Sequence, residues 1–471
     1  MLSIQNTKPW WTLLLPLVAL TAMLAGAPHH RLWMAPVSAL AYMAMQWIFP
    51  KCRFRSEHYF SPVNVALFLM LLKLVAVPAL IVTLGPESPV LLSLPALASM
   101  EAALAIDTIA FVALCLGLHY TSEPRTAIGF RLPPPSVAIT MLFAIFGLLG
   151  FVAEFGSIDR MFLYFTGPTV AVEIQQDLDG TLTGLLGTFL RPFFAFSLIA
   201  LWTRLADHKL GTWQVTLYGI VAAIGITLAN MTFNFNRAAF VFPLITLIAV
   251  YHDRIRRIPL AWTAGAAMIA LPALLMVSTY RTNLMTGTDA NGNGALDAIS
   301  ENIQGYAVGP QYTGLFYDRI GWGDHLYLGT TLVASAMSPV PILGKNFRDA
   351  NGPALFNRAI YGVSGIEDQI LPFATELFAN FHIVGVVVGF IALGFLIGKT
   401  EQWIHAADSS FAAFALQYAA IWTAMLTTWS VSIYAQILIY FFGPIYVYLF
   451  SIHIREWLKR TTAAPRWETA Q

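Results

Sequence analysis

Arginine side chains stand at the borders of apolar stretches, where they could bind an anion. Arg191 lies inside one apolar run, Arg237 follows Asn236 at the start of another, and Arg281 follows Tyr280 at the end of a third. A guanidinium group can bind phosphate through two parallel hydrogen bonds, so these arginines could hold a phosphate or pyrophosphate ester at a membrane surface. Alternatively, each arginine reaches lipid headgroups or pairs with a nearby carboxylate.

Carboxylates that could act with these arginines lie in and before the segment LPFATELFANF. Glu376 is in this segment, and Glu367 and Asp368 precede it. A carboxylate at this place could accept the proton of a hydroxyl nucleophile. Alternatively, Glu376 is only an acid in the first turn of a helix, where the helix dipole stabilises negative charge.

Lys73 and Asp107 lie in the middle of two consecutive apolar runs. Charged groups inside a membrane need a partner or a purpose. The simplest interpretation is a buried ion pair that joins two helices, and the alternative is part of a proton or ion path in a transporter.

The stretch DANGNGALD has the spacing of the start of an EF-hand loop. The oxygen ligands would be Asp289, Asn291, Asn293 and Asp297. The twelfth position is Ser300, where an EF-hand needs glutamate. A turn rich in glycine and asparagine explains the same residues without calcium, so we expect no cofactor.

The composition is that of a membrane protein. Hydrophobic residues make up 57% of the 471 residues and charged residues only 11%, against about a quarter charged in soluble domains. The net charge of +1 without a basic run argues against a nucleic-acid partner. No P-loop, HExxH, GxSxG or dinucleotide motif is present, which argues against ATP-driven transport, zinc proteolysis and redox chemistry.

Apolar runs long enough to cross a bilayer, which takes about 20 residues, recur along the chain. Twelve are found, at residues 10–27, 32–50, 62–84, 99–119, 135–155, 183–203, 212–231, 236–252, 259–279, 374–397, 411–430 and 433–453. We therefore predict an all-α, polytopic fold of about twelve transmembrane helices, forming a single transmembrane domain over residues 1–471.

Basic residues indicate how these spans are oriented. The even-numbered connections and the C-terminal tail carry most of the lysines and arginines, including KCRFR and RIRR. The positive-inside rule then places both termini in the cytoplasm. The long connection over residues 280–373 falls on the outer side. Within it, the apolar run 330–344 is too short to span, so we expect an interfacial or re-entrant segment.

This order of features resembles the Wzy-type oligosaccharide repeat-unit polymerases, which build O-antigens, capsules and exopolysaccharides. The shared features are about twelve spans, the Asn236–Arg237 pair, a further arginine after the next span, and a long external loop. The family often has an acid, then Asn-Phe-Gly and a glycine-rich helix after that loop. Matching positions here are Glu376, Asn380, Phe381, Gly385 and Gly389. His382 stands where the family has glycine.

The resemblance implies transfer of a glycan from a polyprenyl pyrophosphate carrier to another lipid-linked repeat unit, without a metal, on the outer face of the cytoplasmic (inner) membrane. The implied catalytic residues are Glu376, Asp368, Arg237 and Arg281. The implied substrate-binding residues are Arg191, Asn236, Tyr280, Tyr312, Arg348 and Tyr361. The implied partners are the lipid-linked oligosaccharide, membrane lipids, and a chain-length regulator and flippase of the same pathway.

Two alternatives stay open. An O-antigen ligase would use the same donor but deliver the glycan to a lipid A core sugar. A secondary transporter or flippase of lipid-linked glycans would instead use Lys73 and Asp107 as coupling groups.

Overall fold

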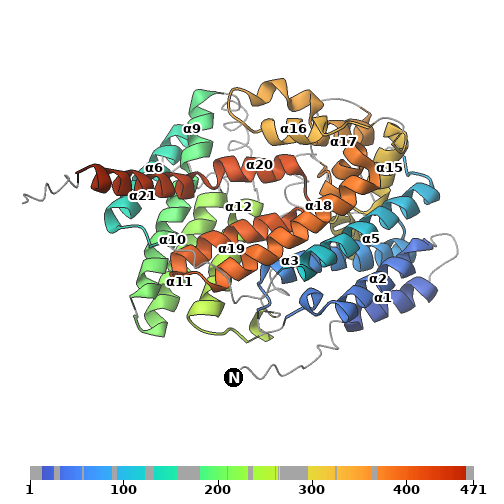
Figure 1. Ribbon diagram of the computed structural model, residues 1–471, viewed down its shortest axis with the longest axis horizontal. Helices are drawn as coiled ribbons and strands as arrows, with labels where there is room; N and C mark the ends of the chain where they lie inside the picture. The colour runs from blue at the N-terminus through green and yellow to red at the C-terminus, as the bar shows by residue number, and fades with distance from the viewer. Residues whose placement is uncertain are drawn as a thin grey trace, which may run out of the picture. The chain divides into compact units, whose positions relative to one another are not determined.

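The computed structural model of the protein (Figure 1) describes residues 13–25, 32–55, 58–86, 93–121, 132–156, 181–208, 210–231, 237–259, 261–263, 265, 295–323, 326–362 and 369–462. Every regular element in these ranges is a helix. The chain divides into two compact units. The first contains Met1–Arg131, Ile245–Asp408 and Ala412–Gln436, and the second contains Leu132–Leu244, Ser409–Phe411 and Ile437–Gln471.

The first unit begins with helices α1 (Leu14–Ala25), α2 (Met34–Ile48), η3 (Pro50–Cys52), α3 (Pro62–Leu71), η4 (Leu72–Ala76), α4 (Val77–Leu84) and α5 (Leu97–His119). It continues with α14 (Ala295–Tyr306), α15 (Pro310–Ile320), α16 (Thr330–Met337), η7 (Gly344–Asn346), η8 (Arg348–Ala350), α17 (Gly352–Tyr361) and α18 (Phe373–His405). Most of α19 (Ser410–Met425) and the C-terminal part of α12 (Arg237–Arg254) also belong to it.

The second unit contains helices α6 (Val137–Phe155), α9 (Leu182–Leu190), α10 (Pro192–Asp207), α11 (Thr212–Met231) and α21 (Gly443–Thr462). Helix α20 (Val431–Tyr440) is divided between the units. Within this unit α10 packs on α6 and α11. The rings of Phe143 and Phe193 meet edge to face at this contact, 5.2 Å apart.

Six helical segments are long and apolar enough to cross a membrane. They are Pro62–Leu84, Leu97–His119, Val137–Glu154, Leu182–Asp207, Thr212–Ala229 and Phe373–His405. Helices α20 and α21 would make a seventh span, although they are bent by 50° at their junction. The prediction of an α-helical, multi-pass membrane protein is thus confirmed, while the count of twelve spans stays a prediction.

Helices α5 and α18 form the centre of the first unit, where they lie side by side (Figure 1). Glycines allow their close approach. A methyl group added to Gly117 would collide with the backbone of Ile391, and one added to Gly394 would collide with the backbone of Leu114. Membrane helices have no hydrophobic drive toward each other and gain from such close contact of small residues.

A buried ion pair joins η4 to α5. Lys73 Nζ lies 2.8 Å from Asp107 Oδ1, and the two side chains are only 1% and 4% exposed. This contact agrees with the simplest interpretation of the two charges, a link between neighbouring helices. Lys73 lies in a π-helical turn. Such turns are rare in proteins overall, and those that occur are often found at functional sites.

The described parts of the predicted outer connection are folded. Residues 295–323 and 326–362 form α14, α15, α16, α17 and two short 3₁₀ turns. The segment predicted to be interfacial begins as α16, which ends before Pro339, because proline cannot continue a helix at that point. Helix α14 packs on α4, α15 packs on α5, and α16 packs on α18, while α17 packs on α15 and α16.

Candidate functional site

Glu376 lies in the first turn of α18 and is 1% exposed. Its Oε1 accepts a hydrogen bond of 2.6 Å from the hydroxyl of Ser335, on α16. The same hydroxyl accepts the backbone N–H of Gly352, the first residue of α17, at 3.0 Å. Glu376 and Ser335 therefore link three helices: the first turn of α18, helix α16 and the first residue of α17. An acid that only stabilises the helix dipole needs no such contacts.

The second carboxylate oxygen of Glu376, Oε2, lacks the hydrogen bond that Oε1 has. Oε2 is buried, and no donor from the described residues meets hydrogen-bond geometry with it. The backbone N–H of Val431, at the start of α20, interacts with the carboxyl group from nearby. A buried polar atom without a full partner costs free energy, so it needs an explanation such as a catalytic role. Glu376 Oε2 can thus accept a proton, or a hydrogen bond from a hydroxyl group.

Asn380 lies one helical turn after Glu376 and is fully buried. Its Nδ2 donates to Thr331 Oγ1 at 2.6 Å and to the Glu376 carbonyl at 2.7 Å. Its Oδ1 accepts the N–H of Gly329 at 2.8 Å. Asn380 therefore fixes the start of α16 against α18, and α16 carries the serine that holds Glu376.

Helix α18 is broken at His382, where φ is 57° and ψ is −156°. The carbonyls of Ala379 and Asn380 accept the N–H groups of Tyr327 and Leu328, each at 3.2 Å. This backbone conformation is almost confined to glycine and costs a non-glycine residue about 1–3 kcal/mol. The glycine that the polymerase motif has at this position is thus the residue that the local backbone favours.

Other strained residues gather in the same part of the chain. Within the described ranges, the non-glycine residues with positive φ are Val308, Trp322, Leu328, Ile342 and His382. All lie between residues 308 and 382, the part of the chain that contains Ser335, Glu376 and Asn380. Because such conformations persist mainly where surrounding structure enforces them, often at functional sites, their clustering supports a site here.

Three of the predicted substrate-binding residues lie in the first unit, which also contains Glu376. Tyr312, on α15, is 2% exposed and belongs to the hydrophobic core. Tyr361 ends α17, and its hydroxyl accepts a 3.4 Å hydrogen bond from Gln369 Nε2. Arg348 begins η8 and is exposed, next to α16. Of the three, Arg348 is the one whose side chain is open to a large ligand.

Arg191 belongs to the second unit, at the junction of α9 and α10. Its Nε lies 3.0 Å from Glu154 Oε2, and both side chains are 6% exposed. The contact favours the alternative in which this arginine pairs with a nearby acid. Glu154 was not among the predicted site residues. Its only signal in the sequence is that it is a lone acid near the end of the apolar run 135–155.

The remaining predicted residues lie outside the described residues. They are Asn236, Tyr280, Arg281, Asp289, Asn291, Asn293 and Asp368. Arg237 and Asp297 lie in α12 and α14, but their side chains are not described. The convergence of Arg191, Arg237 and Arg281 on one ligand therefore stays a prediction.

Ser335 is the hydrogen-bond partner of Glu376 that the sequence did not reveal. A serine inside the apolar run 330–344 carries no signal of its own. Among the described residues, no group of three or more His, Cys, Asp or Glu side chains is placed to hold a metal ion. No protein-family model, curated protein or solved structure matches this chain.

Proposed function

We propose that the protein is a glycosyltransferase that joins polyprenyl-pyrophosphate-linked oligosaccharide units on the outer face of the cytoplasmic membrane. The observation that carries this proposal is the buried Glu376 carboxylate, which Ser335 holds through one oxygen while the other lacks a full partner. It is supported by the break in α18 at His382, the position at which the acid–Asn–Phe–Gly motif of the polymerases has glycine. The motif residues have separate physical tasks there.

In the proposed reaction, the acceptor sugar hydroxyl approaches Glu376 Oε2. The hydroxyl oxygen forms a bond to the anomeric carbon of the donor glycan, and its proton passes to the carboxylate. The bond between the anomeric carbon and the pyrophosphate oxygen breaks, and the leaving pyrophosphate keeps the electron pair. Glu376 then returns its proton to solvent or to the released pyrophosphate.

Positive charge is needed where the pyrophosphate leaves, because that group gains charge in the transition state. We assign this task to Arg237 and Arg281, with the exposed Arg348 on η8 as the group that first meets the donor. Asp368 and Tyr361 are proposed to contact the sugars, and Arg191 is assigned to its ion pair with Glu154. In the proposed topology, about twelve spans place both termini in the cytoplasm and α14–α17 outside.

An O-antigen ligase would use the same donor and the same carboxylate, and only the acceptor would differ. A transporter is a second candidate, favoured by the buried Lys73–Asp107 pair beside a π-helical turn. Under that alternative the pair would open and close during transport. Glu376 would then be a structural residue.

The glycans on the surface of cells that lack the protein distinguish a polymerase from a flippase. Loss of a polymerase leaves single repeat units on the cell surface, and loss of a flippase leaves none. We expect the deletion strain to show single units. Chains should return with the wild-type gene and with Glu456→Gln, an exposed carboxylate of α21, but not with Glu376→Gln. Long chains made by a well-expressed Glu376→Gln variant would overturn the assignment of the site.

A further inference from the structure

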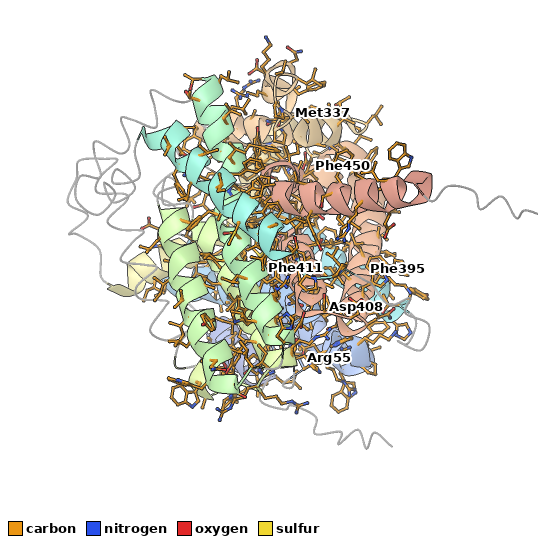
Figure 2. The ribbon with its side chains drawn as sticks, turned by 90° about the vertical axis from the view of Figure 1, so that its left-hand side faces the viewer. Arg55, Met337, Phe395, Asp408, Phe411 and Phe450 are labelled. Carbon is orange, nitrogen blue, oxygen red and sulfur yellow. The ribbon has the colours of Figure 1, made fainter. Side chains whose placement is uncertain are left out.

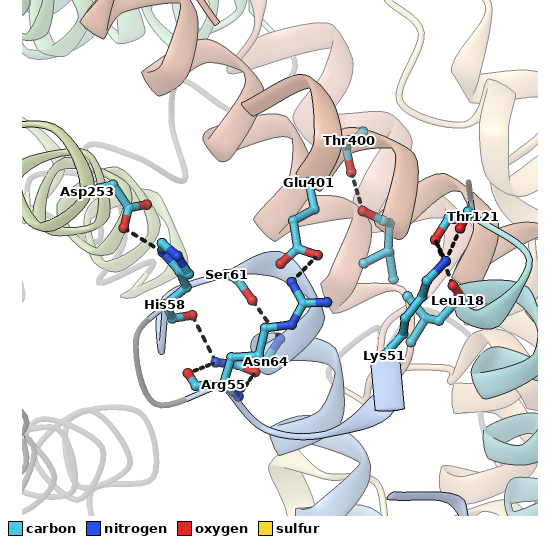
Figure 3. Close-up of polar contacts among 11 residues, drawn as sticks. Lys51, Arg55, His58, Ser61, Asn64, Leu118, Thr121, Asp253, Thr400 and Glu401 are labelled. Carbon is cyan, nitrogen blue, oxygen red and sulfur yellow. Dashed lines mark hydrogen bonds and ion pairs between the residues drawn. The ribbon is translucent and has the colours of Figure 1, made fainter. Parts of the chain in front are cut away.

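A second polar cluster lies at the other end of α18 from Glu376. Figure 2 places Arg55 and Asp408 far from Met337, the last residue of α16. Figure 3 shows the cluster in detail. It joins the connection 53–61, of which the structure describes residues 53–55 and 58–61, to the C-terminal ends of α12 and α18. None of its residues takes part in the reaction proposed for Glu376.

Two ion pairs attach the connection 53–61 to the helices. Arg55 Nη1 lies 3.2 Å from Glu401 Oε2 on α18. His58 Nδ1 lies 3.2 Å from Asp253 Oδ1 on α12. The rings of His58 and His405 are 5.1 Å apart and meet edge to face. One short segment thus makes a charged contact to each helix end.

Neutral contacts hold the same segment in place from its other side. Asn64 Nδ2 donates to the carbonyls of Arg55 and His58, each at 2.8 Å (Figure 3). Ser61 caps the start of α3 by accepting the N–H of Asn64. These bonds do not depend on pH in the neutral range, so they anchor the segment whatever the charge of the histidine.

Arg254 connects the two helix ends directly. Its Nη2 donates to the carbonyls of Ile404 at 3.1 Å and Ala407 at 2.8 Å, at and just beyond the C-terminus of α18. A cation at this position also interacts favourably with the helix dipole. The connection 53–61 therefore closes against a preformed junction of α12 and α18.

A cavity of about 260 Å³ lies within this junction. Its lining includes His58, Asp253, Arg254, His405 and Gln417. Beside it, Glu401 is 6% exposed, and its Oε1 has no hydrogen-bond partner among the described residues. The cluster thus combines space for water, two histidines and a buried carboxylate oxygen that can accept a further hydrogen bond.

The charge of this junction depends on its histidines. The groups that face His58 are Arg55 on its own segment, Asp253 and Arg254 on α12, Glu401 and His405 on α18, and the neutral Gln417 on α19. The two arginines balance the two carboxylates. The hydrogen bond to Asp253 raises the pKa of His58 above its ordinary value of 6.5, against the opposing effect of burial. His58 therefore binds a proton more readily than an isolated histidine.

We propose that this cluster is a proton-binding site that fastens the connection 53–61 to the ends of α12 and α18 when His58 is charged. The ligand is the proton, and His58, with Asp253 as its partner, is the group that binds it. When the proton leaves, the charged contact to Asp253 becomes at most a neutral hydrogen bond, which is about half as strong. The contact of His58 with α12 then loosens, which widens the cavity.

The direction of the pH effect follows from the raised pKa of His58. The stabilising contact is complete below the ordinary pKa of 6.5 and is lost as pH rises through the raised value in the folded protein. This contact should therefore be looser at pH 8.5 than at pH 6.

Hydrogen–deuterium exchange of the full-length protein in nanodiscs tests this. After correction for intrinsic exchange, peptides covering the connection 53–61 should lose protection between pH 6 and pH 8.5. His58→Gln should remove this dependence, and His453→Gln, an exposed histidine of α21, should keep it. Equal pH dependence in the wild type and His58→Gln, or none in the wild type, would overturn the proposal.

A second measurement covers the case in which His58→Gln fails to fold. Nuclear magnetic resonance of histidine-labelled wild-type protein should show one ring titrating above 6.5, and Asp253→Asn should lower that value. A His58 ring that titrates at or below 6.5 in the wild type excludes the site. Neither experiment measures glycan synthesis, so the outcome is independent of the proposed function.

Discussion

At the scale of single residues, Glu376 and Ser335 share one hydrogen-bond chain that ends at the Gly352 N–H. Ser335 is a positioning residue, because it holds the carboxylate without contacting the reacting atoms. Replacing it leaves a buried acceptor and a buried donor without partners.

Ser335→Ala should lower the free energy of unfolding by about 1–3 kcal/mol, since both Glu376 Oε1 and the Gly352 N–H lose their partner. Thermal unfolding in detergent measures this. Thr330→Ala, which removes only an exposed local hydrogen bond, should change the stability much less. Equal stability of the two variants would show that the hydrogen bonds of Ser335 to Glu376 and Gly352 do not stabilise the fold.

The strain at His382 gives a prediction that separates backbone from side chain. His382→Gly and His382→Ala both remove the ring that packs 4.5 Å from Phe378. Only glycine tolerates φ of 57° with ψ of −156° at little cost. The glycine variant should therefore be more stable than the alanine variant by about 1 kcal/mol or more.

Val384 provides the control, because it lies just beyond the break in regular helix. There the order should reverse, with Val384→Ala more stable than Val384→Gly by about 1 kcal/mol. If alanine is also the more stable residue at position 382, the helix is not broken at that residue.

At the scale of helices, the contact between α5 and α18 is set by glycines on both sides. Gly117→Ala and Gly394→Ala should each destabilise the protein by about 1–3 kcal/mol, because the added methyl group meets the backbone of the other helix. Gly211→Ala is the matched control, since its methyl group would meet nothing closer than a side-chain oxygen at 3.7 Å. Thermal unfolding in detergent again measures the difference.

Apolar runs in the sequence predicted the position of most helices well. The run 62–84 is one continuous helical segment, and the run 99–119 is nearly the whole of α5. Breaks were not predicted. The run 433–453 bends by 50° between α20 and α21, where Gly443 and Pro444 begin the second helix. Hydropathy reports which residues avoid water, and it carries no information on where tertiary contacts replace helical hydrogen bonds.

The candidate site was only partly predictable for a related reason. Glu376 and Asn380 stood out because polar residues in an apolar run are rare. Ser335 did not, because serine is common in membrane helices and its importance comes from a contact 41 residues along the chain. The cluster of Arg55, His58, Asp253 and Glu401 was also missed, since its members come from one connection and the ends of two helices that are far apart in the sequence.

At the scale of the whole molecule, the proposed orientation assigns the two ends of α18 to opposite sides of the membrane. The native cysteines, Cys52 and Cys115, are both buried, so an introduced surface cysteine can be labelled selectively. Arg348→Cys should react with a membrane-impermeant maleimide in intact spheroplasts. Arg256→Cys, which replaces an exposed residue after α12, should react only after permeabilisation. The reverse pattern would place the Glu376 site inside the cell and contradict the proposed function.

Polymerisation by the purified protein shows most directly whether Glu376 accepts the proton of the acceptor sugar. Wild-type protein and Glu456→Gln, incubated with lipid-linked repeat units, should produce a ladder of longer glycans and release polyprenyl pyrophosphate at equal rates. Glu376→Gln should slow both by about 10²–10⁴-fold while still binding the donor, because glutamine preserves the shape but cannot take up a proton. A Glu376→Gln rate within a factor of about two of the wild type would contradict the account, since two-fold lies far below what a catalytic base contributes.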